Sequence, residues 1–330
     1  MLSALAGKRI LFIGPKTFGY ETAIQAALRR AGADVVFVSE WPTTSRIAKG
    51  IGRLMPNVLW PYSDCVFRRW LDHAAPADVD IVFVIKGEGI SPGFLRRLRD
   101  RYARAFFVLY LWDSMENVRG TERKLFAFDR RLSFDPADCS MDSELVYRPL
   151  FFLDAYRRGE SEGGEGVFFV GTLNGDRPAV LARLLRRSAP GFALDYWLFV
   201  RSDLELTLRR MSDRALRQLD PRRLLRTPMS AEQTARHLSL SAAALDIEHP
   251  RQRGLTMRTF EVLASGKKLI TTNRGIASHS FYDPARICVV DRLDPRVPDG
   301  FLEGKPKPLP SGFFEDYSID GWLRDVLVTR

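Results

Sequence analysis

The stretch from Ala242 to Thr272 most constrains the fold of this chain, because it has the pattern of one complete strand–helix–strand unit. An apolar run from Ala242 to Ile247 suits a buried strand, and Leu269 to Thr272 suits a second one. Between them, Gly254 opens a segment with regularly placed apolar residues, and Ser265-Gly266 ends it. Strands joined by such a helix pair in parallel. We therefore predict an α/β fold, with a ligand-binding loop at the carboxyl edge of a parallel sheet.

The start of this predicted helix suits an anionic ligand. Its first turn offers unsatisfied N–H groups and the positive end of the helix dipole, which together favour a phosphate or diphosphate. Arg253 and Arg258 add positive charge there. Glu261 is a single carboxylate in an apolar run, and it could accept hydrogen bonds from two ribose hydroxyls. The alternative is a solvated Glu261 that pairs with Arg258 through helical spacing.

The run GLTMRTFEVLASGKKLITTN resembles the nucleotide-sugar motif of GT-B glycosyltransferases, in particular the group-1 and CgeB-like (spore-maturation-like) enzymes of bacterial surface polysaccharide synthesis. Arg258, Glu261, Gly266 and Lys267 match that motif in order and spacing. The resemblance implies that Glu261 binds the ribose of the donor nucleotide. It does not extend to recognition of the donor sugar, because Arg253 stands where many group-1 enzymes carry a second Glu.

The resemblance implies a GT-B fold, in which two Rossmann-like domains face each other across a cleft. The 330 residues suffice for two α/β domains. We expect an acceptor-binding domain over residues 1–153, a polar linker over 154–166 and a nucleotide-sugar-binding domain over 167–330. In GT-B folds the last helix, here Ser318 to Leu327, often crosses back to the first domain.

The second expected domain begins with the segment FVGTLNGDR, which resembles the first strand and loop of GT-B donor domains. There Gly171 would let the backbone approach a phosphate, and Arg177 would clamp it with two hydrogen bonds. The predicted donor-binding residues are Gly171, Thr172, Arg177, His249, Arg253, Gly254, Leu255, Thr256, Arg258 and Glu261.

The first expected domain starts with a strand, Lys8 to Gly14, followed by the loop Gly14 to Tyr20. The run GPKTFG lacks the glycine spacing of a dinucleotide-binding loop. In the two-domain interpretation, Gly14, Phe18 and Gly19 line the interdomain cleft. An ordinary strand-to-helix turn is the alternative.

Two acidic residues follow the third and fourth expected strands. Glu88 lies in KGEGISP, where Ser91-Pro92 starts a helix, and Asp113 lies in YLWDS. If the sheet is parallel, both lie at its carboxyl edge, where a sugar hydroxyl could meet a general base. Both segments resemble parts of the CgeB-like enzymes, so we predict Asp113 and Glu88 as catalytic candidates. The alternative for Asp113 is a helix cap.

The net charge of +10 and the pI of about 9.7 indicate a polyanionic partner. No nucleic-acid-binding motif accompanies this charge, so nucleic acid is not an expected partner. The segment Thr43 to Tyr62 interleaves Arg46, Lys49 and Arg53 with apolar residues and suits an anionic membrane surface. A core-packed helix with a solvated basic face is an equally good explanation.

The three cysteines and four histidines are scattered, so no metal site or redox motif is expected. The N-terminus lacks the pattern of a signal peptide, which predicts a cytoplasmic protein; the basic segment adds a peripheral position on the inner face of the plasma membrane. The predicted function is metal-independent glycosyl transfer, without a cofactor, from a nucleoside-diphosphate sugar to a cell-surface glycan or lipid-linked acceptor. The alternatives are a nucleotide-sugar epimerase and a non-catalytic nucleotide-sugar-binding subunit.

Overall fold

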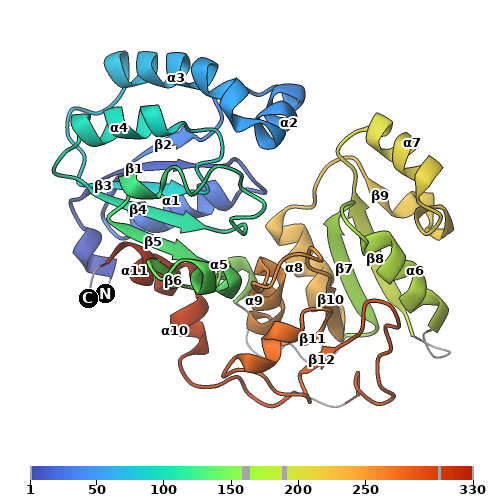
Figure 1. Ribbon diagram of the computed structural model, residues 1–330. Coiled ribbons are helices and arrows are strands. Elements are labelled where there is room, and N and C mark those ends of the chain that lie inside the picture. The colour runs from blue at the N-terminus through green and yellow to red at the C-terminus, as the bar shows by residue number, and fades with distance from the viewer. Residues whose placement is uncertain (1, 158–163, 188–191, 304–305, 329–330) are drawn as a thin grey trace. The chain divides into compact units, whose positions relative to one another are not determined.

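The computed structural model describes residues 2–157, 164–187, 192–303 and 306–328, which form two compact α/β units (Figure 1). The first unit holds the chain up to Leu150 together with the segment from Ile319; the second unit runs from Phe151 to Ser318. Each unit contains one six-stranded sheet in which all the strand pairs are parallel. The predicted α/β class with two Rossmann-like domains is confirmed.

The sheet of the first unit has the strand order β2-β1-β3-β4-β5-β6. Its strands are β1 (Arg9–Gly14), β2 (Asp34–Ser39), β3 (Ile81–Ile85), β4 (Phe106–Leu111), β5 (Arg130–Ser133) and β6 (Leu145–Tyr147). Its α-helices are α1 (Tyr20–Arg30), α2 (Arg46–Leu54), α3 (Pro56–His73), α4 (Pro92–Arg101), α5 (Pro136–Met141) and α11 (Ile319–Leu327). The order reverses between β1 and β3, and α/β sheets bind ligands outside the carboxyl ends of the two strands at such a point.

Alternating side chains of these strands build a core on each face of the first sheet. Leu11 and Ile13 pack in one buried cluster with side chains of α3 and α4. On the other face, the ring of Trp322 in α11 lies 5.9 Å from the ring of Phe83 and 4.9 Å from that of Tyr110. Trp322 is fully buried, so the last helix of the chain is part of this core.

The second sheet has the order β12-β11-β10-β7-β8-β9, which reverses between β7 and β10. Its strands are β7 (Val167–Thr172), β8 (Leu194–Phe199), β9 (Leu224–Leu225), β10 (Ala243–Asp246), β11 (Lys268–Thr271) and β12 (Ile287–Val289). Its α-helices are α6 (Arg177–Arg187), α7 (Asp203–Ser212), α8 (Ala231–Ser239), α9 (Met257–Ala264) and α10 (Phe313–Tyr317). Among the described helices of both units, none combines the length and the apolar character needed to cross a membrane.

The predicted linker at 154–166 is described only in part, because residues 158–163 lie outside the described residues. Its beginning, Asp154–Tyr156, is a short 3-10 helix, η3, that packs on α8 and α9 within the second unit. Beside it, the N–H of Phe152 donates to the carbonyl of Tyr317 at 2.9 Å. The segments that enter and leave the second unit therefore run side by side.

Candidate functional site

The start of α9 is the feature of the second unit best suited to an anionic ligand. The helix begins at Met257, and its cap residue Thr256 makes no side-chain bond to the first-turn amides. Instead, the hydroxyls of Thr256 and Thr259 donate to Oδ2 of Asp246 at 2.7 and 2.9 Å. The cap side chain is thus held toward the end of β10 and does not occupy the space in front of the first turn, where the helix dipole favours an anion.

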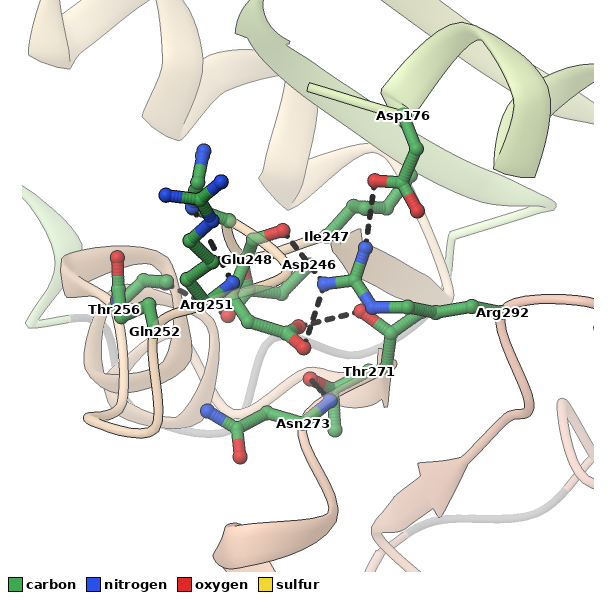
Figure 2. Close-up of polar contacts among 12 residues, drawn as sticks. Asp176, Asp246, Ile247, Glu248, Arg251, Gln252, Thr256, Thr271, Asn273 and Arg292 are labelled. Atoms are coloured by element: carbon green, nitrogen blue, oxygen red, sulfur yellow. Dashed lines mark hydrogen bonds and ion pairs between the residues drawn. The ribbon is translucent and has the colours of Figure 1, made fainter. Parts of the chain in front are cut away.

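The loop before α9 is fixed by a residue that follows β11. Nδ2 of Asn273 donates to the carbonyls of Arg253 and Gly254, each at 3.2 Å. Nε2 of Gln252 donates to the same Gly254 carbonyl at 3.0 Å, and Leu255 is buried. Asn273 and Gln252 both lie beside this loop in Figure 2. Because the loop is held at several points, its backbone is preorganised for a ligand at the helix start.

A second group of contacts joins the loops after β7, β10 and β12. Figure 2 shows the guanidinium of Arg292 between two carboxylates: Nη1 donates to Oδ1 of Asp176 at 2.7 Å, and Nη2 lies 2.6 Å from Oε1 of Glu248. Nη2 also donates to the main-chain carbonyl of Glu248 at 2.7 Å. The hydroxyl of Thr272 donates to the Glu248 carboxylate. Burial raises the pKa of Glu248, although Thr272 and Arg292 oppose the shift.

The loops after β7 and β10 also approach each other at Gly175, which faces the ring of Pro250. A Cβ atom on Gly175 would lie 3.4 Å from Cδ of Pro250. The neighbouring His249 accepts a hydrogen bond at Nδ1 from the N–H of Arg251 at 3.3 Å. The side chain of Arg253 is exposed, while its carbonyl is held by Asn273. The strand-order reversal therefore gathers most of the predicted donor-binding residues at one sheet edge.

Arg177 and Gly171 have structural contacts that differ from the phosphate-binding roles implied by the resemblance. Nε of Arg177 donates to the carbonyl of Ile247 at 2.8 Å, and Nη1 donates to the carbonyl of Thr172 at 3.0 Å. Arg177 thereby ties the end of β7 to the end of β10. A Cβ atom on Gly171 would lie 2.9 Å from the ring of Phe169, so packing alone accounts for this glycine.

Arg258 and Glu261 form an ion pair with a distance of 2.9 Å between Nη1 and Oε2. Glu261 is only 1% exposed, so the solvated carboxylate considered as the alternative is not what the structure contains. Beside the pair lies Tyr156 of η3, whose pKa is raised by burial and by the negative charge of Glu261. A buried pair depends strongly on both partners, because removing one leaves a charge in a poorly solvating environment.

The first unit has its own cluster of charged groups at the carboxyl edge of its sheet. Nζ of Lys86 lies 2.8 Å from Oδ2 of Asp113 and 3.6 Å from Oε2 of Glu88. Nε of Arg53 lies 3.3 Å from the same Glu88 oxygen. Behind them, Oε2 of Glu40 accepts a hydrogen bond from the N–H of Glu88 at 2.8 Å. Since all the strands are parallel, Glu88 and Asp113 do share one edge, as predicted.

Exposure and burial give these groups different properties. The side chain of Asp113 is 39% exposed and that of Glu88 only 6%, so Asp113 is the more accessible candidate base. Burial raises the pKa of Glu40 from 4.5 to about 7. Burial would lower the pKa of Lys86, but the carboxylates of Asp113, Glu88 and Glu40 together raise it. Burial lowers the pKa of Lys124 to about 8, and its ammonium donates to the carbonyl of Gly87 at 2.6 Å.

Two loops at the strand-order reversal of the first sheet have left-handed backbone conformations. After β1, Phe18 has φ 52° and is 54% exposed, and Gly19 has φ 81°. After β3, Lys86 has φ 61°. Such conformations are uncommon for residues other than glycine and concentrate at functional sites. Gly14 ends β1, where a Cβ would lie 3.0 Å from the ring of Phe12.

Several polar residues of these two sheet edges were missed by the sequence analysis. In the second unit they are Asp176, Asp246, Glu248, Asn273 and Arg292; in the first they are Glu40, Lys86 and Lys124. Most lie at the end of a strand or within three residues after it, and that position was the available signal. The same signal identified Glu88 and Asp113 after the third and fourth expected strands, but it was not applied to the other strands.

No protein-family model and no curated protein matches this chain. Solved structures do share its fold. HepE from Anabaena, in complex with UDP and glucose, has a TM-score of 0.53 and 11% identity, over 87% of each chain. The catalytic domain of starch synthase IV from Arabidopsis thaliana, bound to ADP and acarbose, has a TM-score of 0.53 and 9% identity, over 87% of this chain and 88% of that one. With two parallel six-stranded sheets, this likeness confirms the predicted GT-B fold.

Proposed function

We propose that the protein is a glycosyltransferase of the CgeB-like group that moves a sugar from a nucleoside-diphosphate donor to a cell-surface glycan or lipid-linked acceptor. The observation that carries the proposal is the start of α9, where the cap residue Thr256 turns its hydroxyl to Asp246 and the helix begins at the strand-order reversal of the second sheet. HepE in complex with UDP-glucose has the same fold, with a TM-score of 0.52 and 12% identity, which supports a nucleoside-diphosphate sugar as the ligand.

In this proposal the diphosphate binds at the first turn of α9. The amides and the positive helix end hold it, and Arg253 and Arg258 contribute charge without a metal ion. Glu261 is proposed to accept the ribose hydroxyls. Since it is buried and paired with Arg258, this contact requires the carboxylate to become accessible to the nucleotide. Before that step it orients Arg258 next to the helix start.

The acceptor is assigned to the first unit, with Asp113 as the general base. The acceptor hydroxyl gives its proton to the Asp113 carboxylate, its oxygen bonds to the anomeric carbon, and the bond from that carbon to the diphosphate breaks. Nζ of Lys86, 2.8 Å from Oδ2 of Asp113, fixes the orientation of this carboxylate. Glu88 is buried against Arg53 and Lys86 and is proposed as a hydroxyl ligand or a second candidate base.

A thermal-shift screen over nucleotides and nucleotide sugars, followed by a transfer assay on the same protein, tests this function. A ligand that binds the native state raises the unfolding midpoint. We expect a nucleoside diphosphate and its sugar to raise it, and the sugar to be transferred to a glycan or lipid-linked acceptor at the cytoplasmic side of the membrane. Donor turnover without an acceptor would favour an epimerase, and stabilisation without turnover a binding subunit. The absence of any shift would overturn the proposal.

A further inference from the structure

Five large apolar side chains at the junction of α2 and α3 face solvent. They are Ile51, Leu54, Met55, Val58 and Tyr62, with exposed fractions between 42% and 63%. Ile51 and Leu54 lie three residues apart at the end of α2, Met55 joins the two helices, and Val58 and Tyr62 lie four residues apart on α3. Such spacings place side chains on one face of a helix. We call these five residues the apolar stripe. For the segment Thr43 to Tyr62, a core-packed helix was one of two explanations, and it does not hold for the five residues of the apolar stripe because they face solvent.

The packed side of α2 explains why the stripe faces outward. Gly52 is buried, and a Cβ atom there would lie 2.8 Å from the ring of Trp41 and 2.8 Å from Cδ2 of Leu59. Through this glycine, α2 packs closely against Trp41 and against Leu59 of α3. With that side occupied, the apolar stripe on the remaining surface is left without a covering element among the described residues.

The surroundings of the stripe are basic. Between Thr43 and Tyr62 the sequence has three basic residues and no acidic residue. On the neighbouring face of α3 lies an open depression of about 520 Å³, whose walls include Arg68, Arg96 and Arg123. Asp64 is the one acidic residue of its lining, and it accepts a hydrogen bond from the hydroxyl of Ser91. The depression therefore has an excess of positive charge.

The combination of exposed aliphatic side chains and neighbouring arginines suits the surface of an anionic lipid bilayer. The boundary of a lipid bilayer offers acyl chains for the aliphatic groups and, where the lipids are anionic, phosphates for the arginines. A nucleic acid would use the arginines but offers little to a row of aliphatic side chains. The guanidinium of Arg123 already lies 5.1 Å from the ring of Trp60, which holds it at the rim of the depression.

We propose that the apolar stripe docks on the surface of an anionic lipid bilayer, and that the arginine-lined depression beside it binds a lipid phosphate. The proposal rests on the proposed function for its purpose, which is to bring the first unit to a lipid-linked acceptor. Its physical content is independent of glycosyl transfer, since docking requires neither a nucleotide nor an acceptor.

Co-sedimentation of the full chain with vesicles tests the docking. The vesicles are phosphatidylcholine alone or phosphatidylcholine with phosphatidylglycerol, each at low and high salt. We expect binding to the anionic vesicles, weakened by salt. The double variant Leu54→Ser/Val58→Ser should lower the partition coefficient about ten-fold or more, because both side chains lose their apolar contact with the lipid.

The chain offers a control in α7, where Leu204 and Leu208 are 70% and 57% exposed and Leu204 lies between the acidic residues Asp203 and Glu205. Leu204→Ser/Leu208→Ser should leave the partition coefficient unchanged. Arg68→Gln/Arg96→Gln should reduce binding to the anionic vesicles and reduce its dependence on salt.

The proposal is overturned if the wild type does not bind anionic vesicles, or if the α7 control lowers binding as much as the stripe variant. It is also overturned if the wild type self-associates through the stripe instead, seen as a dimer in sedimentation velocity that the stripe variant loses. Thermal shifts with a nucleoside diphosphate are measured on the same samples. Vesicle binding without such a shift would uphold docking and refute the donor site, and a shift without vesicle binding would do the reverse.

Discussion

The guanidinium of Arg292 and the carboxylate of Glu248 form an ion pair, 2.6 Å between Nη2 and Oε1, that joins the loop after β12 to the loop after β10. The side chains are 18% and 6% exposed, so the pair is largely shielded from water. The same guanidinium reaches Asp176 after β7. Three loops at the carboxyl edge of the second sheet are thus held by one arginine, which makes the candidate donor site rigid before any ligand binds.

This geometry predicts that Arg292→Gln is strongly destabilising. The change leaves the carboxylates of Glu248 and Asp176 near each other without their shared cation, at a cost of roughly 3 kcal/mol of unfolding free energy. Arg274→Gln is the control, because the Arg274–Asp291 pair is 77% and 45% exposed. Its effect on the unfolding free energy should be small, because solvent screens an exposed pair. Urea denaturation of both variants measures the difference, and similar losses would contradict the assignment.

The predicted contrast between Arg258 and Glu261 tests the donor site. Arg258→Ala should weaken the binding of a nucleoside diphosphate far more than that of the nucleoside, because the guanidinium is proposed to bind the phosphate groups. Glu261→Gln should weaken both, by on the order of 1.5–3 kcal/mol, if its carboxylate receives the ribose hydroxyls. Calorimetric titrations of both ligands measure this.

Because the Arg258–Glu261 pair is buried, each variant is also checked by denaturation before its titration. A variant that is destabilised yet binds both ligands normally would show that the pair is structural. Equal affinities across the wild type and both variants would remove the site assignment.

Asp113→Asn and Glu88→Gln test the acceptor side. At least one should lose glycosyl transfer while keeping its nucleotide affinity, because a general base acts on the acceptor hydroxyl and not on the donor nucleotide. We expect the larger loss, about 100-fold or more in transfer rate, for Asp113→Asn, since Asp113 is the more exposed carboxylate. Full transfer by both variants would exclude both residues from this role.

The burial of Glu40 predicts a pH dependence of stability. Its pKa is raised from 4.5 to about 7, so the protonated carboxyl is favoured in the folded chain. The resulting stabilisation is complete below about pH 4.5 and is lost as the pH rises through 7. Glu40→Gln keeps an acceptor for the N–H of Glu88 and removes the titration. As the pH rises from about 4.5 to 7, the unfolding free energy of Glu40→Gln should therefore rise by up to about 3 kcal/mol relative to that of the wild type.

Chemical denaturation of both proteins in half-unit steps from pH 4.5 to 7.5 measures the Glu40 effect. Parallel pH profiles for wild type and Glu40→Gln would show that Glu40 titrates alike in the folded and unfolded chain.

In the loop after β3, Gly89 has no room for a side chain. A Cβ atom there would lie 2.3 Å from the carbonyl oxygen of Glu40, so Gly89→Ala must displace backbone at the edge of the first sheet. We expect Gly89→Ala to lower the unfolding free energy by about 1–3 kcal/mol. Gly50→Ala in α2 is the control, because nothing lies within 4 Å of its added Cβ and alanine favours helix by about 0.5–1 kcal/mol. Thermal unfolding midpoints that shift alike would argue against this packing.

Local features of both units were determined by the sequence by itself. The strands before Glu88 and Asp113 follow from short apolar runs, and Ser91-Pro92 starts α4 as expected, with the Ser91 hydroxyl accepting from the N–H of Phe94. The strand–helix–strand unit around α9 was readable for the same reason. Periodicity and capping act over a few residues, and parallel strands then place their carboxyl ends at one edge.

Only the tertiary structure decided which of these side chains meet and which face water. Lys86 joins Asp113 because β3 and β4 are neighbours, and Arg292 reaches Glu248 because β10 and β12 flank β11. Glu261 lies on α9, where all the residues from Thr259 to Ala264 are buried, whereas Leu54 at the end of α2 faces solvent. Helical spacing shows that a helix has an apolar side, but which side is covered depends on the elements packed against it, and these come from distant parts of the chain.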